Sequence, residues 1–168
     1  MGRDEAGGQL SSQGNDTLVE RASDRELSVT RVFNAAPSVV FKAWTQPDLF
    51  KRWWTPKSSG MTLVSCEMDV RVGGGYRLEF GRHGSDRTMS FFGTYLEVVP
   101  ASRLVWTNEE GPDGAVTTVT FTEYYGRTLL VLSELYPSKE ALDASFEGME
   151  EGMPEQFGQL HELLSELE

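Results

Sequence analysis

The C-terminal stretch from Ser138 to Glu168 carries one continuous stripe of large apolar side chains. Successive members are separated by 4, 3, 4, 4, 3, 4 and 3 residues, the spacing of one face of an α-helix. The members of the stripe are Leu142, Phe146, Met149, Met153, Phe157, Leu160, Leu164 and Leu167. The pattern predicts a single long amphipathic helix, and such a helix needs a wide apolar surface to cover its stripe.

Pro154 lies in the middle of this predicted helix. A proline there removes one backbone hydrogen bond and costs ~3 kcal/mol, but burial of the stripe at ~1.5–3 kcal/mol per large side chain outweighs the loss. We therefore expect a kinked but continuous helix. Gly148 and Gly152 weaken it by about 1 kcal/mol each relative to alanine. Two hypotheses are open. Either the helix opens at this place to admit a ligand, or the glycines allow close approach to a sheet and the kink at Pro154 follows the curvature of that sheet.

The formal net charge of −11 argues against a nucleic-acid partner, which would need clustered Lys and Arg. Much of the excess negative charge lies on the predicted helix, where a single lysine, Lys139, accompanies nine acidic residues. These are Glu140, Asp143, Glu147, Glu150, Glu151, Glu155, Glu162, Glu166 and Glu168. We interpret them as a solvated outer face. The alternative is an acidic surface that docks on a chaperone or on another basic protein.

A length of 168 residues suits one domain with a single core. No apolar run approaches the ~18 residues of a membrane span, and the N-terminus lacks the apolar segment of a signal peptide. Cys66 is the only cysteine, so the chain has no internal disulfide. We expect a cytoplasmic protein that does not insert into a membrane.

Residues 1–26 contain too few apolar side chains to offset the entropy of ordering, so we expect a disordered segment followed by one domain over 27–168. Alternation of Leu27, Val29 and Phe33 predicts the first strand. Arg31 interrupts its apolar face. We interpret Arg31 as an edge or end residue, and the alternative is a guanidinium that reaches into a cavity.

Two short helices are predicted after this strand. Pro37 suits a first helical turn, and the following apolar residues repeat at helical spacing as far as Trp44. A second helix is expected from Leu49 to Trp54, and it ends with the adjacent pair Trp53 and Trp54. Core packing is the favoured role for this pair, and lining a ligand site is the alternative.

From Met61 onward the hydrophobic periodicity changes from helical to alternating. Tyr76, Leu78 and Phe80 share one strand face while Arg77 and Glu79 share the other, which is typical of a sheet with one solvated side. Glycine-rich and proline-containing turns separate six such segments, predicted at 61–69, 75–83, 88–99, 103–109, 115–125 and 127–136. The short connections predict an antiparallel meander.

Five collinear stretches resemble one branch of the START and birch-pollen-allergen (SRPBCC) superfamily, the branch named for homology to the C-terminal domain of the heat-shock protein 90 ATPase activator. The stretches are VFNAAPSVVFKAW (32–44), TQPDLFKRWWTP (45–56), CEMDVRVGGGY (66–76), GTYLEVVPASRL (93–104) and FEGMEEGMPEQFGQLHELL (146–164). The resemblance implies an α+β helix-grip fold. In that fold a curved antiparallel sheet, here of seven strands in the order β-α-α-β6-α, packs its concave face on the long C-terminal helix.

The same resemblance implies a cavity between the sheet and the terminal helix that takes apolar molecules such as lipids, hormones or polyketides. We expect non-enzymatic binding of a small hydrophobic or aromatic ligand, with inward-facing aromatic and apolar side chains around it. The residues expected to line the cavity are Trp53, Trp54, Met68, Tyr76, Leu78, Phe91, Tyr95, Trp106, Phe121, Phe146, Met149, Met153 and Phe157. The alternatives are a chaperone-associated or stress-response interaction protein and a cyclase-type or hydrolase-type enzyme.

Catalytic and metal signatures are weak in this sequence. Cys66 would need a nearby histidine to act as a nucleophile, but His83 falls at a predicted turn and His161 lies near the end of the long helix. We interpret Cys66 as a small buried apolar residue. The sequence has no CxxC, HxxxH or HExxH spacing, and Gly73-Gly74-Gly75 lacks the spacing of a phosphate-binding loop. We therefore predict no metal and no cofactor.

The enzyme alternative requires a titratable side chain inside the cavity. Arg31, Glu67 and Arg77 are the nearest candidates in the sequence, and none has an evident partner there. Contact between two of them within the cavity would favour catalysis.

Overall fold

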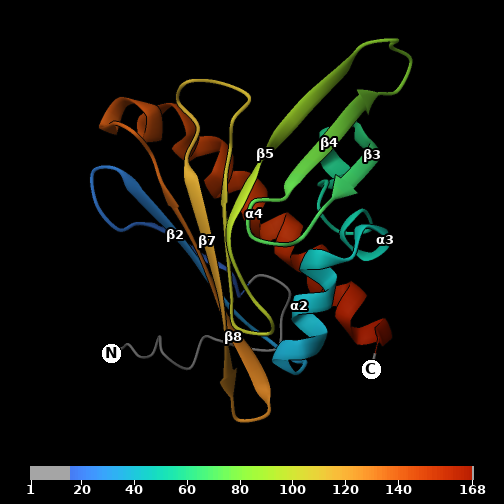
Figure 1. Ribbon diagram of the computed structural model, residues 1–168, viewed down its shortest axis with the longest axis vertical. Helices are drawn as coiled ribbons and strands as arrows, with labels where there is room; N and C mark the ends of the chain where they lie inside the picture. The colour runs from blue at the N-terminus through green and yellow to red at the C-terminus, as the bar shows by residue number, and fades with distance from the viewer. Residues whose placement is uncertain (1–15, 168) are drawn as a thin grey trace.

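The computed structural model describes residues 16–167, which form an α+β domain (Figure 1). Two strands are followed by short helices, a six-strand meander and one long helix. The elements are β1 (Leu18–Arg21), β2 (Glu26–Phe33), α2 (Pro37–Thr45), α3 (Pro47–Phe50), the 3-10 helix η1 (Lys57–Ser59), β3 (Met61–Met68), β4 (Gly75–Arg82), β5 (Thr88–Val99), β6 (Arg103–Thr107), β7 (Val116–Tyr124), β8 (Arg127–Leu135) and α4 (Lys139–Leu167).

The strands form one antiparallel sheet in the order β1-β2-β8-β7-β6-β5-β4-β3. In Figure 1, β3, β4 and β5 make one wing of the sheet, and β2, β8 and β7 make the other. Within residues 16–167 the sheet has eight strands, so the prediction of seven was wrong. The six meander strands lie within two residues of their predicted bounds, because alternation and turn residues are both read locally.

The additional strand, β1, lies in the segment that was expected to be unstructured. Leu18 to Arg21 pair with Thr30 to Leu27 of β2, and the backbone N–H of Ala22 donates to the carbonyl of Glu26 across the connecting turn. Val19 packs against the core. Residues 1–15 of the predicted disordered segment lie outside the described residues.

Arg31 is neither an edge residue nor an end residue, because β1 covers β2 on its outer side. Its side chain is only 2% exposed. The guanidinium donates to the hydroxyl of Thr17 at 3.2 Å and lies 5.3 Å from the ring centre of Phe33. The strand β1 thus encloses a charge that sequence reasoning placed at the surface.

The strand β5 joins the two wings of the sheet by changing partners along its length. Residues 88–94 pair with β4, whereas Tyr95 and the residues after it pair with β6. Gly93 lies at this change of partner, and a Cβ atom added there would lie 1.9 Å from the carbonyl oxygen of Thr107. The backbones of β5 and of the end of β6 approach so closely that only glycine fits.

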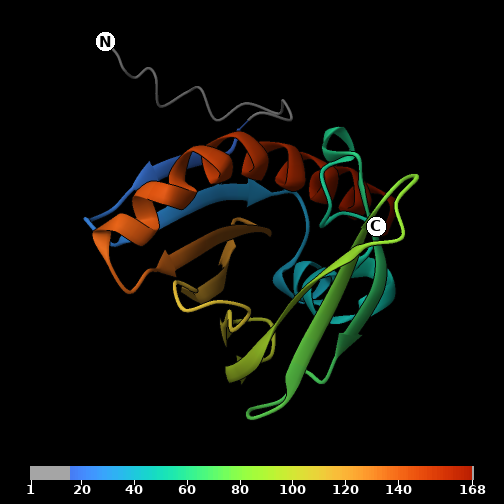
Figure 2. The ribbon, with the colours of Figure 1, turned by 90° about the horizontal axis from the view of Figure 1, so that it is seen from above.

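The helix α4 is continuous through Pro154 and packs against β1, β2 and α2 (Figure 2). The figure shows the sheet curving from the strands beside α4 round to β3, β4 and β5. Five members of the predicted stripe are buried, Phe146 and Met149 are partly buried, and Leu163 is buried in addition. Leu167 is 36% exposed, so its assignment to the buried stripe was wrong.

The glycines of α4 do not serve close packing. A Cβ atom added at Gly148 or at Gly152 would meet no atom within 4 Å outside the helix's own nearby backbone. The hypothesis that these glycines allow close approach to the sheet is therefore wrong. None of the described helices is long and apolar enough to cross a membrane.

The tryptophans form the centre of the aromatic core. Trp44 lies 4.7 Å from Trp53 and 6.2 Å from Phe157, measured between ring centres. Both contacts are edge-to-face, a favourable arrangement for aromatic pairs. The helix α3 ends at Phe50, so Trp53 and Trp54 follow it in a turn rather than lying on a longer helix.

Candidate ligand-binding cavity

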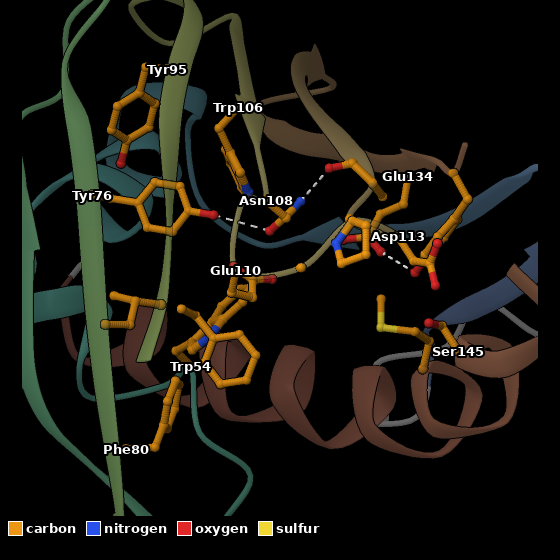
Figure 3. A pocket seen from close by; sticks show the side chains of 18 of the residues that line it. Trp54, Tyr76, Phe80, Tyr95, Trp106, Asn108, Glu110, Asp113, Glu134 and Ser145 are labelled. Atoms are coloured by element: carbon orange, nitrogen blue, oxygen red, sulfur yellow. Dashed lines mark hydrogen bonds between the residues drawn. The ribbon is translucent and has the colours of Figure 1, made fainter. Parts of the chain in front are cut away.

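A cavity of about 570 Å³ lies between the β3 to β6 wing of the sheet, the end of β8, the turn after α3 and the first half of α4. Figure 3 looks into it. The lining residues are Phe50, Trp54, Met68, Tyr76, Leu78, Phe80, Phe91, Tyr95, Trp106, Asn108, Glu110, Gly111, Pro112, Asp113, Gly114, Ala115, Glu134, Tyr136, Ser145 and Met149. The exposed loop residues Glu110 to Asp113 place its opening between β6 and β7.

The structure divides the thirteen predicted lining residues into two groups. Those that line the cavity are Trp54, Met68, Tyr76, Leu78, Phe91, Tyr95, Trp106 and Met149. Those that lie elsewhere are Trp53, Phe121, Phe146, Met153 and Phe157. Four of the second group are buried among other core side chains, whereas Phe146 is partly buried beneath the guanidinium of Arg21. The adjacent tryptophans thus have different roles, because Trp53 donates its indole N–H to Ala43 in the core.

Three aromatic rings form one wall of the cavity. The ring centres of Tyr76 and Tyr95 each lie 6.4 Å from the ring centre of Trp106, and all three rings meet edge to face. The hydroxyl of Tyr76 lies 2.8 Å from the carbonyl oxygen of Thr107 and 3.1 Å from Oδ1 of Asn108. Burial raises the pKa of both tyrosines, so they are neutral hydroxyl groups at physiological pH.

Asn108 connects the aromatic wall to the opposite end of the cavity. Its side-chain N–H group donates to the carbonyl of Ala115 at 2.7 Å and to the hydroxyl of Thr117 at 3.0 Å. These bonds hold the two ends of the loop between β6 and β7 together. A Cβ atom at Gly114 would lie 1.9 Å from the backbone oxygen of Asn108, so this loop closes only with glycine there.

Glu134 carries the carboxylate at the other end. Tyr136 donates its hydroxyl to one oxygen at 2.7 Å, and Thr117 donates to the other at 3.1 Å. Burial raises the pKa of Glu134, and the nearby charge of Glu110 raises it further, whereas the two hydroxyl donors lower it. In Figure 3, Glu134 and Ser145 lie on one side of the cavity, and Tyr76, Tyr95 and Phe80 lie on the other. The cavity is therefore polar at one end and aromatic at the other.

Sequence reasoning predicted the tyrosines Tyr76 and Tyr95 but missed the carboxyl and amide side chains of the cavity, although alternation could have found two of them. Glu134 has the same strand parity as Leu130 and Leu132, both of which face the core. Asn108 continues the parity of Leu104 and Trp106 beyond the end of β6. A polar residue at an inward position of a strand is a signal for a cavity. Glu110 and Asp113 lie on a loop, where no such parity exists.

The three candidates for catalysis lie outside the cavity. Arg31 is buried on β2, on the same strand face as Val29 and Phe33, and Glu67 is exposed on β3. Arg77 pairs with Glu79 at 2.9 Å on the solvated face of the sheet. Contact between two of these residues in the cavity, which would have favoured an enzyme, does not occur.

Cys66 and the histidines also stay apart from the cavity lining. Burial raises the pKa of the Cys66 thiol to about 11, so the group is a neutral thiol and a poor nucleophile at physiological pH. His83 lies in the exposed turn between β4 and β5, and His161 lies on α4 near its end. Within residues 16–167, no group of three His, Cys, Asp or Glu side chains is arranged to hold a metal ion.

Residues 34–165 match the family described as Activator of Hsp90 ATPase homolog 1-like protein. The chain belongs to this family. The family is a branch of the SRPBCC superfamily, in agreement with the five sequence stretches and with the arrangement of sheet and terminal helix. The match includes every residue that lines the cavity.

Solved structures of bacterial proteins share the fold. A Rhodobacter sphaeroides protein is 25% identical, with a TM-score of 0.82 over 90% of this chain and 99% of that chain. A Nitrosomonas europaea protein is 20% identical, with a TM-score of 0.80 over 89% and 99%. The AHSA1-like protein from Aeromonas hydrophila is 22% identical, with a TM-score of 0.71 over 85% and 95%. No curated protein matches the chain.

Proposed function

We propose that this protein of the Activator of Hsp90 ATPase homolog 1-like family binds a small apolar or aromatic molecule in the cavity beside α4, without transforming it. One observation supports the proposal most. The cavity of about 570 Å³ is walled by eight aromatic side chains, which are Phe50, Trp54, Tyr76, Phe80, Phe91, Tyr95, Trp106 and Tyr136. Ligand sites of roughly 300–1,000 Å³ with this kind of lining are common in proteins.

The polar groups of the cavity are few and well placed to orient a ligand. Tyr95 and the indole of Trp106 stand at the aromatic end, and Ser145 and Glu134 stand at the polar end. Most of the ligand's surface would thus contact aromatic rings, while one polar group would set its direction. We also infer a cytoplasmic location, because the chain has one cysteine and no disulfide.

Fluorescence of N-phenyl-1-naphthylamine tests this proposal, because the neutral probe brightens in an apolar site. We expect saturable brightening with the wild-type protein. Ser145→Phe should abolish it, since the ring would occupy the cavity from α4. Ala144→Phe is the matched control, because Ala144 is exposed on the same helix turn. Circular dichroism melting of all three proteins would verify that each is folded.

Two results would contradict the proposal. One is wild-type protein that gives no saturable brightening, and the other is a folded Ser145→Phe variant that binds the probe as tightly as Ala144→Phe does. Competition with sterols, fatty acids and aromatic polyketides would then rank the ligand classes for a protein that passes the test.

Docking of a chaperone or another basic protein on α4 is a second candidate, and the exposure of Glu147, Glu150 and Glu151 favours it. Other acidic residues of α4 have roles within the molecule. Glu155 accepts hydrogen bonds from the backbone and the hydroxyl of Ser58, and Glu166 pairs with Arg52. The candidate docking surface is therefore the turn from 147 to 151, a smaller area than the acidic composition of the helix indicates.

A further inference from the structure

The charged residues of the cavity lining all have the same sign. Glu110 and Asp113 lie on the exposed loop that connects β6 and β7, and Glu134 lies at the polar end. Among the described residues that line the cavity there is no lysine, arginine or histidine. Burial raises the pKa of Glu134, and a cation beside it favours its ionised form. Walls of low polarity strengthen the field of ionised carboxylates, so the interior favours cations and disfavours anions.

The aromatic wall favours the same sign of charge. The face of an aromatic ring carries negative charge density, and a cation within about 6 Å of it is attracted, most strongly by tryptophan. Trp54, Trp106 and Tyr76 present such rings to one cavity. An apolar molecule with a positive group would therefore find attraction along the cavity and not only at the carboxylates.

Glu134 is fixed in position as an acceptor. The hydroxyls of Tyr136 and Thr117 donate to its two oxygens at 2.7 and 3.1 Å, which holds the carboxyl group in one orientation. Each carboxylate oxygen accepts more than one hydrogen bond, so an ammonium group has acceptor capacity left to use. Ser145, from α4, supplies a further hydroxyl oxygen at this end.

We infer that the cavity selects molecules in which an amine or another cationic group is attached to an apolar or aromatic body. The positive group faces the Glu134 end, and the body packs against the aromatic wall. The inference rests on the proposed function and narrows it, because it removes fatty acids and other anionic lipids from the preferred ligands.

Three probes with one ring system test this inference by isothermal titration calorimetry at neutral pH. They are 1-naphthylmethylamine, which is cationic, 1-naphthylmethanol, which is neutral, and 1-naphthoate, which is anionic. We expect the amine to bind about tenfold more tightly than the alcohol, in keeping with a partly desolvated cation beside rings and carboxylates. The naphthoate should bind most weakly.

Variants that neutralise single carboxylates then show which residues cause the preference for the amine. Glu134→Gln should remove most of the advantage of the amine, measured as the ratio of the dissociation constants of alcohol and amine for the same variant. Asp113→Asn, an exposed loop change that does not threaten folding, should reduce the advantage in part. Glu147→Gln removes the same charge from the outer face of α4, so it should leave the ratio of the two constants unchanged.

The outcomes separate the two proposals. Equal binding of amine and alcohol, or tightest binding of naphthoate, would overturn the cation preference while the cavity remained a ligand site. Full retention of the preference in both Glu134→Gln and Asp113→Asn would overturn the assignment to these carboxylates. Absence of binding for all three probes would overturn the preference together with the proposed function.

Discussion

At the scale of single residues, Gly93 sets the shape of the molecule. Its hydrogen atom occupies the place where any other residue would direct a Cβ atom at the carbonyl of Thr107. The close approach brings the end of β6 within reach of Tyr76 on β4, whose hydroxyl forms hydrogen bonds with Thr107 and Asn108. One missing side chain thus positions the aromatic wall of the cavity.

Gly93→Ala should destabilise the domain by about 1–3 kcal/mol, the usual cost of forcing an additional carbon into a filled site. The neighbour is backbone rather than a flexible side chain, so the strands themselves have to shift. Gly111→Ala is the matched control, because a Cβ atom there meets nothing within 4 Å and should change stability by less than about 0.5 kcal/mol. Urea denaturation of the three proteins measures the difference. Equal stability of the two variants would contradict the close approach.

Glu134 should make stability depend on pH in a definite direction. Burial raises its pKa in the folded protein above the unfolded value, so folding favours the protonated form. The associated stability is present below the unfolded pKa and is lost as pH rises through the raised folded pKa. Tyr136, Thr117 and Glu110 are the groups that act on this carboxyl group.

The free energy of unfolding of wild-type protein should therefore fall, relative to Glu134→Gln, as pH rises above the ordinary glutamate pKa of about 4.5 and through the raised folded pKa. The glutamine does not ionise, so any other effect of the substitution is a constant offset over this range. Urea denaturation at several pH values measures the difference, and Glu147→Gln on the exposed face of α4 serves as the control. A difference that stays constant with pH would show that the Glu134 pKa is not raised.

At the scale of secondary-structure elements, α4 combines a well-anchored end with a weak middle. Leu160, Leu163 and Leu164 are buried near its C-terminus. Gly148 and Gly152 have no packing role, because a Cβ atom at either position would meet open space. The hypothesis that the helix opens near Pro154 to admit a ligand therefore stays a prediction. The rival hypothesis is wrong about close approach at the glycines, and its statement that the Pro154 kink follows the curvature of the sheet stays a prediction as well.

Amide exchange of the ligand-free protein should be faster over 147–156 than over 158–165. The double variant Gly148→Ala with Gly152→Ala should stabilise the helix by about 1 kcal/mol per site and slow exchange over 147–156. It should also slow the entry of an apolar probe without changing the fold. Equal protection of the two segments in wild-type protein would end the gate hypothesis.

The elements that sequence predicts well are those whose signals are local. Alternation and turn residues located β3 to β8, and the stripe from Leu142 located α4. β1 was missed because four residues, Leu18 to Arg21, are too short and too polar to show a pattern. Its existence depends on β2, whose outer edge it covers, and this error led to the wrong placement of Arg31.

At the scale of the whole molecule, the cavity was only partly predictable. Trp53 and Trp54 are adjacent in the sequence, yet one lies in the core and the other lines the cavity. Core and cavity residues share the inward face of the same sheet, so alternation cannot separate them. The cavity depends on how the two wings of the sheet meet along β5, which changes partners next to Gly93, and no local pattern in the sequence reports that geometry.

Docking on the acidic face of α4 would depend on the charge of the protein surface, so the affinity for a partner should fall as salt concentration rises. A lysine variant at Glu147, Glu150 and Glu151 should lose any specific partner that wild-type protein retains in a pull-down. High salt should release the same partner, because charges are screened over a Debye length of ~8 Å at physiological ionic strength.

A matched lysine variant at Glu67, Asp86 and Glu123 changes the net charge equally at exposed sites on β3, on the turn between β4 and β5, and on β7. It should retain the partner. Loss of the partner from both variants would indicate a general effect of net charge, and retention by both would exclude docking on 147–151.

The loop between β6 and β7 contributes residues to the cavity but not to the sheet, so its sequence can affect ligand choice without affecting the fold. Glu110 to Asp113 line the cavity opening, but they belong to no strand and leave the α4 interface untouched. Substitutions that accumulate at these positions during evolution can change ligand preference without changing the fold. A library of variants at the same positions would therefore test new ligand specificities with little loss of stability. This tolerance to substitution ends at Gly114, because the backbone oxygen of Asn108 leaves room there for glycine alone.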